Sequence, residues 1–165
     1  MSKILKEVNV REIENMEIAY VRHVGPYKES PEVFGKLFDK LCSWAGPRGL
    51  INPPETKMLT VYHDDPAVVE EAKQRISVSL TVGKDVEGSY GIERMTIEGG
   101  SYVVGSFELT PNQYGEAWSY IYSEWLLTSG YKPVEKLCFE VYLNNPSEHP
   151  EGKHIVDIYV PVEKA

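Results

Sequence analysis

The sequence predicts an α+β fold in which a β-α-β-β unit occurs twice, forming a curved, mostly antiparallel sheet with two helices that flank a central groove. Stretches in which apolar and polar residues alternate indicate half-buried strands. Residues 31–45 and 111–128 instead carry an apolar stripe at spacings of three and four, which indicates helices. Similar segments recur 80 positions apart, as from 60 to 140, and this favours an internal repeat.

The chain opens with a predicted strand and a predicted helix. Apolar residues recur between charged ones over residues 8–24, which we interpret as a strand ending at the Gly-Pro-Tyr corner of residues 25–27. Helical period follows over residues 31–45. Pro31 suits the first turn of this helix, and Ser30 is the expected N-cap.

Two further strands complete the first predicted unit. Residues 57–63 are apolar and β-branched and end at an Asp-Asp-Pro turn at 64–66. Residues 75–82 alternate strictly between apolar and polar positions, as expected of a half-buried strand.

The second half repeats this order. Residues 92–109 are predicted to be extended, with a turn or bulge at Gly99-Gly100. A helix over residues 111–128 follows, capped by Thr110-Pro111 and ended by Gly130, which suits a left-handed position. A strand from Cys138 runs to an Asn-Asn-Pro turn, and the last strand covers residues 155–162.

Matched segments define the repeat. The matches at a separation of 80 are Phe34-Gly35 with Tyr114-Gly115, Thr60–Pro66 with Glu140–Pro146, and Val78, Leu80 and Val82 with Ile158, Val160 and Val162. The first strands match at 84, with Ile13-Glu14 against Ile97-Glu98. We therefore expect one domain over residues 1–165, with pseudo-repeats at about 5–86 and 90–163.

Composition restricts the possible partners. The 165 residues carry a net charge of −8 and no cluster of Lys or Arg, which argues against direct binding to nucleic acid. The acidic balance favours cationic ligands or basic protein partners, although solubility alone also explains it. The start of the chain lacks a signal peptide or long apolar run, so we expect a cytoplasmic protein away from the membrane.

Three common catalytic or ligand-binding motifs are absent from the sequence. It contains no nucleophile elbow and no phosphate-binding loop, and its four histidines lack metal-ligand spacing. The two cysteines, Cys42 and Cys138, form no Cys-x-x-Cys pair and are expected to be reduced thiols. We therefore expect no metal and no cofactor, and a binding role is favoured over catalysis.

Glu140 does not fit a plain core strand. It lies between Phe139 and Val141, and an ionised carboxylate is costly to bury without a partner. Alternation places it on one face with Cys138 and Tyr142. It could line a ligand-binding groove, lie exposed at a sheet edge, or form an internal salt bridge. Its counterpart in the first half is Thr60, so the repeat diverges at this position.

Several aromatic residues are predicted to surround Glu140. Tyr114 and Phe34 open the two helix stripes, Trp118 lies one turn further on, and Tyr27 lies in the first corner. With Tyr62 and Tyr142 they could form an aromatic wall, an arrangement that suits flat or cationic organic molecules. Plain core packing is the alternative for each ring.

The chain resembles the GyrI-like family, the DNA gyrase inhibitory proteins, over residues 5–163. The segments that carry the resemblance are His23–Tyr27, Val61–Pro66, Cys138–Asn145 and Asp157–Val162. The family is similar to the effector-binding domains of AraC-type regulators and multidrug-sensing activators. The resemblance implies a strand glutamate, here Glu140, at the base of a central groove. The ligand-binding residues that it and the repeat predict are Glu140, Tyr142, Tyr114, Trp118, Phe34, Pro26, Tyr27, Met58, Thr60, Tyr62 and His154.

The resemblance also implies functions. We expect a stand-alone protein that binds cationic or aromatic toxins or drugs and either protects DNA gyrase from toxins or inhibits it. No helix-turn-helix segment accompanies the two repeats, so we do not expect a transcription factor. The alternative is a hydrolase that opens cyclopropane rings of DNA-alkylating natural products, with Glu140 as general acid or base.

Overall fold

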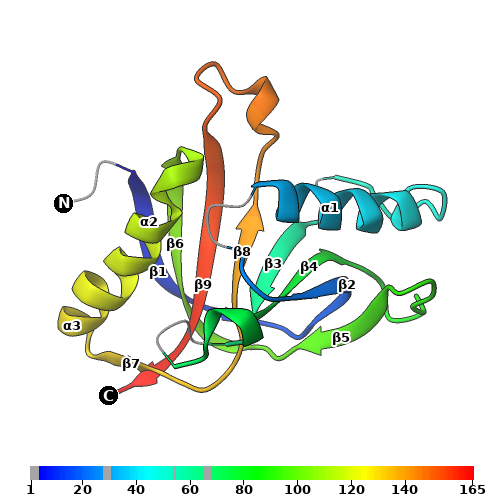
Figure 1. The fold of residues 1–165 in the computed structure, drawn as a ribbon. Helices are drawn as coiled ribbons and strands as arrows, with labels where there is room; N and C mark the ends of the chain where they lie inside the picture. Colours follow the sequence, from blue (N-terminus) through cyan, green and yellow to red (C-terminus); the bar gives the residue numbers. More distant parts are fainter. Residues whose placement is uncertain (1–3, 28–30, 54, 65–67) are drawn as a thin grey trace. The chain divides into compact units, whose positions relative to one another are not determined.

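The computed structural model describes residues 4–27, 31–53, 55–64 and 68–165. The chain divides into two compact units, which we call the 15–98 unit and the 99–165 unit; residues 1–14 belong to the latter. The fold is α+β with antiparallel strand pairing, as the sequence predicts (Figure 1). The predicted N-cap Ser30 and the Asp65-Pro66 part of the predicted turn lie outside the described residues.

The 15–98 unit is a sheet with a helix on one face. Its elements are β2 (Met16–Val24), α1 (Pro31–Ala45), β3 (Met58–Tyr62), a 3₁₀ turn (Glu71–Lys73), β4 (Arg75–Thr81) and β5 (Glu93–Ile97). The strands lie in the order β3-β4-β2-β5. Leu41 and Trp44 of the α1 stripe pack against Val78 and Leu80 of β4, which explains the helical spacing of the apolar residues.

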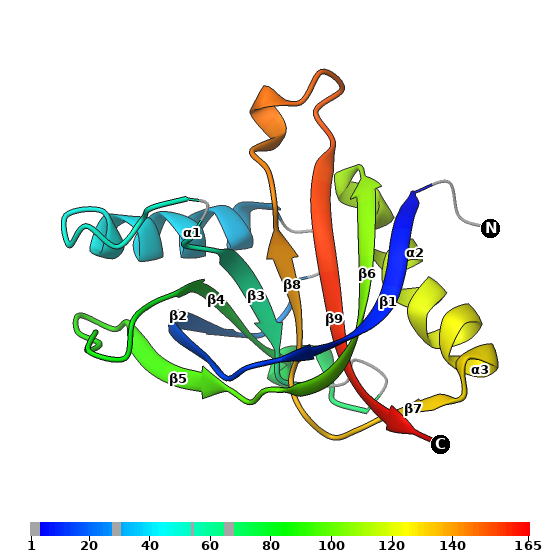
Figure 2. The same ribbon diagram turned by 180° about the vertical axis from the view of Figure 1, so that it is seen from behind.

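The 99–165 unit has the same plan. Its elements are β1 (Leu5–Ile13), β6 (Gly100–Leu109), a 3₁₀ turn (Pro111–Gln113), α2 (Tyr114–Tyr120), a π-helical turn (Ile121–Trp125), α3 (Leu126–Ser129), β7 (Tyr131–Pro133), β8 (Cys138–Tyr142), a 3₁₀ turn (Pro146–Glu148) and β9 (His154–Lys164). The strand order is β1-β6-β9-β8, and β7 pairs with β9. Figures 1 and 2, taken from opposite sides, show α2 and α3 on one face of this sheet.

The helical segment after β6 begins and ends as predicted. Thr110 and Gln113 form a capping box, in which the Thr110 backbone N–H donates to Gln113 Oε1 at 2.9 Å. At the other end, Gly130 has φ of +79°, the left-handed conformation expected after the last helical turn. The sequence did not predict the π-helical turn in the middle of this segment.

The prediction of one strand over residues 8–24 is wrong. The chain forms β1 and then β2, and it passes from one compact unit to the other at Glu14-Asn15. β1 pairs with β6, whereas β2 pairs with β4 and β5. Residues 92–109 likewise divide into β5 and β6 beside the predicted turn at Gly99-Gly100. A local pattern of apolar residues cannot reveal this exchange, because both strands carry it.

Strand registers in the two units agree residue by residue. Thr60 pairs with Val78 in one unit and Glu140 pairs with Ile158 in the other, so both partners differ by 80 positions. The exchanged strands agree at 84: Ile13 pairs with Gly100, and Ile97 pairs with Met16. Each compact unit therefore corresponds to one half of the repeat, except that the two first strands are exchanged. β1 belongs to the 99–165 unit, and β5 belongs to the 15–98 unit.

Candidate functional site

Glu140 is a buried carboxylate with two hydrogen-bond donors. It lies in the middle of β8 and is 2% exposed. The Trp118 indole Nε1–H donates to Glu140 Oε1 at 2.7 Å, and the Tyr142 hydroxyl donates to Oε2 at 2.9 Å. The exposed-edge alternative is therefore wrong. Short bonds to an ionised acceptor are about twice as strong as neutral ones, and they offset part of the desolvation cost of this carboxylate.

The strand pleat determines which side chains accompany Glu140. Cys138 and Tyr142 pack with Ile158 and Ala117 in the core beneath the helical segment, on the same face as Glu140. Phe139 points to the opposite face, where its ring stacks on Tyr159 with centroids 4.6 Å apart. The predicted grouping of Cys138, Glu140 and Tyr142 on one face therefore agrees with the structure.

The helical segment supplies a pair of stacked rings. Trp118 and Tyr122 are one turn apart, with centroids separated by 6.4 Å and planes inclined by 15°. The Tyr122 hydroxyl also lies 3.4 Å from Cys138 Sγ. Helix and strand are thus joined at two points, by Trp118–Glu140 and by Tyr122–Cys138. Tyr122 is 40% exposed and was absent from the predicted site, although its place in the helix stripe could have indicated it.

Tyr114 and His154 form a second polar pair in this unit. The Tyr114 hydroxyl lies 2.6 Å from His154 Nδ1. The two rings pack edge to face, with their centroids 5.6 Å apart. Burial raises the pKa of Tyr114, and the negative charge of Glu140 raises it further. Burial lowers the pKa of His154 below 6.5, so the imidazole is neutral at pH 7.

The remaining predicted residues lie in the 15–98 unit. The centroid of the Tyr27 ring lies 6.3 Å from the ring centroid of Phe34 and 5.8 Å from that of Tyr62. Thr60 is buried on β3, and Met58 packs against the core beneath α1. The Pro26 carbonyl lies 3.2 Å from His23 Nε2.

The eleven predicted residues thus fall into two groups, one inside each unit. The group in the 99–165 unit is Glu140, Tyr142, Tyr114, Trp118 and His154, and the other is Phe34, Pro26, Tyr27, Met58, Thr60 and Tyr62. The first group contains the buried carboxylate and the Tyr114–His154 pair, so we build the candidate site on it. A groove shared by both groups stays a prediction.

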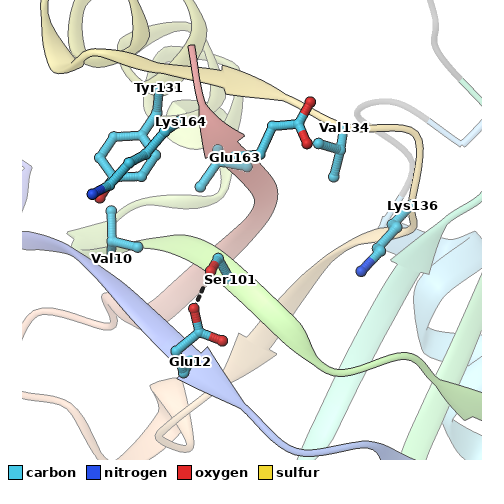
Figure 3. Close-up of a pocket in the computed structure, with 9 residues that line it drawn as sticks. Val10, Glu12, Ser101, Tyr131, Val134, Lys136, Glu163 and Lys164 are labelled. Carbon is cyan, nitrogen blue, oxygen red and sulfur yellow. Dashed lines mark hydrogen bonds between the residues drawn. The ribbon is translucent and has the colours of Figure 1, made fainter.

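A separate cavity of about 520 Å³ lies at the far end of the 99–165 unit (Figure 3). Its lining comes from β1, β6, β7, β9 and the loop between β7 and β8, and it includes none of the predicted site residues. Figure 3 shows Tyr131 and Lys164 at one side of it and Lys136 at the other. Glu12 accepts a hydrogen bond from Ser101, and Glu163 forms an ion pair with Lys132 at 3.4 Å. Its two carboxylates are therefore already engaged.

The described ranges contain neither a cluster of metal-ligand side chains nor a membrane-spanning helix. Among residues 4–27, 31–53, 55–64 and 68–165, no three His, Cys, Asp or Glu side chains gather as metal ligands would. No helix in the same part of the chain is both long and apolar enough to cross a bilayer.

Comparison with known sequences identifies relatives over nearly the whole chain. The model of the GyrI-like small molecule binding domain matches residues 6–163. A DNA gyrase inhibitor of Yersinia enterocolitica is 35% identical over 152 residues, which cover 90% of this chain and 92% of the relative. A DNA gyrase inhibitor of Erwinia billingiae is 31% identical over 162 residues, which cover 96% and 98%.

Solved structures share the fold. The C-terminal domain of EcmrR has a TM-score of 0.76 at 18% identity, covering 96% of this chain and 98% of that domain. The protein SAV2435, solved bound to tetraphenylphosphonium, has a TM-score of 0.64 at 13% identity, covering 96% and 94%. At these identities the likeness concerns the fold alone.

Proposed function

Because the chain belongs to the GyrI-like family, we propose that it binds a small cationic, aromatic ligand and that Glu140 supplies the charge that recognises it. The observation that carries this proposal is the burial of the Glu140 carboxylate against two aromatic donors. Indole and phenol are neutral, so these two bonds stabilise the negative charge without cancelling it. A protein that needed only a stable core would gain more from an apolar residue at this position.

The surroundings of Glu140 favour a cation with aromatic groups. Attraction between opposite charges is several-fold stronger in a partly buried site than in water. Aromatic faces add about 0.5–2 kcal/mol for each well-placed cation. Trp118 and Tyr122 offer stacked rings next to the carboxylate, and Tyr122 is open to solvent. Tetraphenylphosphonium, the ligand of the structural neighbour SAV2435, combines a positive charge with four phenyl rings and is a suitable probe.

Isothermal titration calorimetry with tetraphenylphosphonium tests this proposal. We expect the wild-type chain to bind it and Glu140→Gln to bind at least about tenfold more weakly, because the variant keeps the side-chain shape but loses the charge. Glu163→Gln, which removes an exposed charge from β9, is the matched control and should bind like wild type. Neutral triphenylphosphine oxide should bind poorly. Equal affinity of wild type and Glu140→Gln would rule out this site.

We propose inhibition of DNA gyrase as a second function, acting in the cytoplasm. Its support is that two relatives at 35% and 31% identity, matched over at least nine tenths of their length, are DNA gyrase inhibitors. The net charge of −8 suits a basic protein partner. Purified protein added to a gyrase supercoiling assay should slow supercoiling in proportion to its concentration. Undiminished supercoiling at a large molar excess would count against inhibition, and a gyrase toxin added to the same assay tests protection.

A hydrolase is the alternative to a binding protein. It is favoured by the Tyr114–His154 pair in the unit that holds Glu140, because a carboxylate, a phenol and an imidazole can together supply and accept protons. Incubation with a cyclopropane-bearing DNA-alkylating compound, followed by mass spectrometry, distinguishes the two. Catalytic amounts of protein should convert the compound to its ring-opened, water-added product if it is an enzyme. A stoichiometric complex without product supports binding alone.

A further inference from the structure

The Tyr114–His154 hydrogen bond joins the starts of two elements. Tyr114 is the first residue of α2 and His154 is the first residue of β9, and 40 positions separate them. The bond is 2.6 Å long, and both side chains are partly buried. Recognition of a cation by Glu140 does not by itself require a histidine at this position.

The geometry restricts the proton arrangement. In a neutral imidazole one ring nitrogen carries a hydrogen and the other accepts a hydrogen bond. If Nδ1 accepts, the Tyr114 hydroxyl donates to it, and the phenol oxygen keeps its lone pairs for a ligand. If His154 gains a proton, Nδ1–H becomes a donor to Tyr114 and a positive charge enters the same region. One protonation event therefore changes both the direction of the hydrogen bond and the local charge.

We propose that His154 is a positioning residue that holds Tyr114 and sets the charge preference of the Glu140 site. Neutral His154 keeps the region anionic and receptive to a cation, whereas protonated His154 repels the cation. This inference rests on the proposed binding function and concerns the regulation of the same site.

The charged groups around His154 are consistent with this role. Glu140 and Tyr142 lie on the same face of the sheet, on β8, and Tyr114 approaches from α2. On β6, His154 pairs with Leu109. The neighbouring Glu108 points to the other face, where it pairs with Lys6 at 3.3 Å and His149 at 2.9 Å. Lys153, the preceding residue, lies 3.7 Å from Glu151.

The Glu140 charge therefore lies on the face that His154 shares. Burial lowers the pKa of His154 and so favours the neutral imidazole at pH 7.

Calorimetry with tetraphenylphosphonium at pH 7.5 and pH 5, on wild type and two variants, tests the inference. In His154→Asn the amide oxygen replaces Nδ1 as acceptor but cannot be protonated, whereas His154→Leu has no acceptor. We expect wild type to lose about tenfold in affinity between pH 7.5 and pH 5, and His154→Asn to lose clearly less. At pH 7.5 His154→Asn should bind more tightly than His154→Leu, because only the amide keeps an acceptor for the Tyr114 hydroxyl.

The outcomes separate this inference from the binding proposal. Parallel pH profiles of wild type and His154→Asn, with both binding at pH 7.5, would overturn the role of His154 and leave the binding proposal intact. Absence of binding by wild type at pH 7.5 would overturn the binding proposal itself. An NMR titration of the wild-type imidazole needs no variant: a proton on Nε2 at pH 7.5, and a lower His154 pKa when the probe is added, support the inference. A proton on Nδ1, or a pKa unchanged by the bound probe, contradicts it.

Discussion

Trp118 and Glu140 are joined by a hydrogen bond of 2.7 Å across 22 positions of sequence, and this bond exists in only one half of the repeat. At a separation of 80, the counterparts of these residues are Phe38 and Thr60. Phenylalanine has no donor and threonine has no charge. The indole donor and the carboxylate are therefore both absent at the equivalent positions of the first half.

Replacing Trp118 by Phe should destabilise the protein by about 1–3 kcal/mol, because Glu140 loses a donor while staying buried. Urea denaturation measures this change. Trp125→Phe is the matched control: Trp125 stacks on Tyr131 at 5.8 Å, and the substitution removes a similar volume. If both variants lose the same stability, the hydrogen bond to Glu140 contributes nothing beyond packing.

Replacing Thr60 by Glu should be strongly destabilising, by about 3 kcal/mol or more. Thr60 is fully buried, and the indole that stabilises Glu140 is replaced by Phe38 at the equivalent place. Thr60→Val, which changes shape little, is the control and should cost much less. Thermal unfolding followed by circular dichroism gives both values. A Thr60→Glu protein as stable as Thr60→Val would mean that the first half tolerates the same acid.

Gly105 and Gly115 should respond in opposite ways to alanine. A Cβ at Gly105 would lie 2.7 Å from the Phe107 ring, which is fully buried, so Gly105→Ala should cost about 1–3 kcal/mol. Gly115 lies in α2 with open space around it, and Gly115→Ala should stabilise by about 0.5–1 kcal/mol. Guanidinium denaturation of both variants checks the pair. A neutral Gly105→Ala would show that β6 can move away from the helical segment.

His63 should make the protein sensitive to acid. Burial, followed by the charges of Arg22 and Arg75, lowers its pKa from 6.5 to about 4. The unfolded chain therefore binds a proton first as the pH falls, so stability is complete above pH 6.5 and is lost toward pH 4. The loss reaches up to about 3 kcal/mol.

His63→Asn should flatten the fall in unfolding free energy between pH 7 and pH 5, measured in urea. Ser77→Ala is the control. It removes the 2.6 Å contact between Ser77 Oγ and His63 Nε2 and the 3.5 Å hydrogen bond from Arg22 Nε to Ser77 Oγ. Burial, the largest cause of the lowered His63 pKa, mostly persists. An identical pH slope in wild type and His63→Asn would assign the acid sensitivity to other groups.

The strands and helices with clear periodicity could be predicted from the sequence because their patterns are local. The strict alternation of Ile76, Val78 and Leu80 corresponds to β4, but Ser77 and Ser79 are also fully buried, so the prediction of a half-buried strand is wrong. The stripe that contains Leu41 corresponds to α1. The two sequence offsets of 80 and 84 positions reappear in the strand registers, because the matched residues occupy equivalent positions in the two units.

The surroundings of the site residues could not be predicted in the same way. The hydrogen bond that Glu140 accepts from Trp118 comes from another element, so the sequence alone left an exposed position open. The Tyr114–His154 bond joins a helix start to a strand start, and no spacing rule brings these two ends together. The exchange of β1 and β5 is equally non-local, because either pairing satisfies the same alternation.

That exchange has a consequence for biosynthesis. β1 leaves the ribosome well before its partner β6, which begins only at Gly100, so β1 lacks this partner while residues 14–99 are made. A fragment that stops at residue 86 would lack β5, and its β1 would have no β6 to pair with. A circular permutant opened between Glu14 and Asn15, with the old termini linked, would instead encode each compact unit as one uninterrupted stretch.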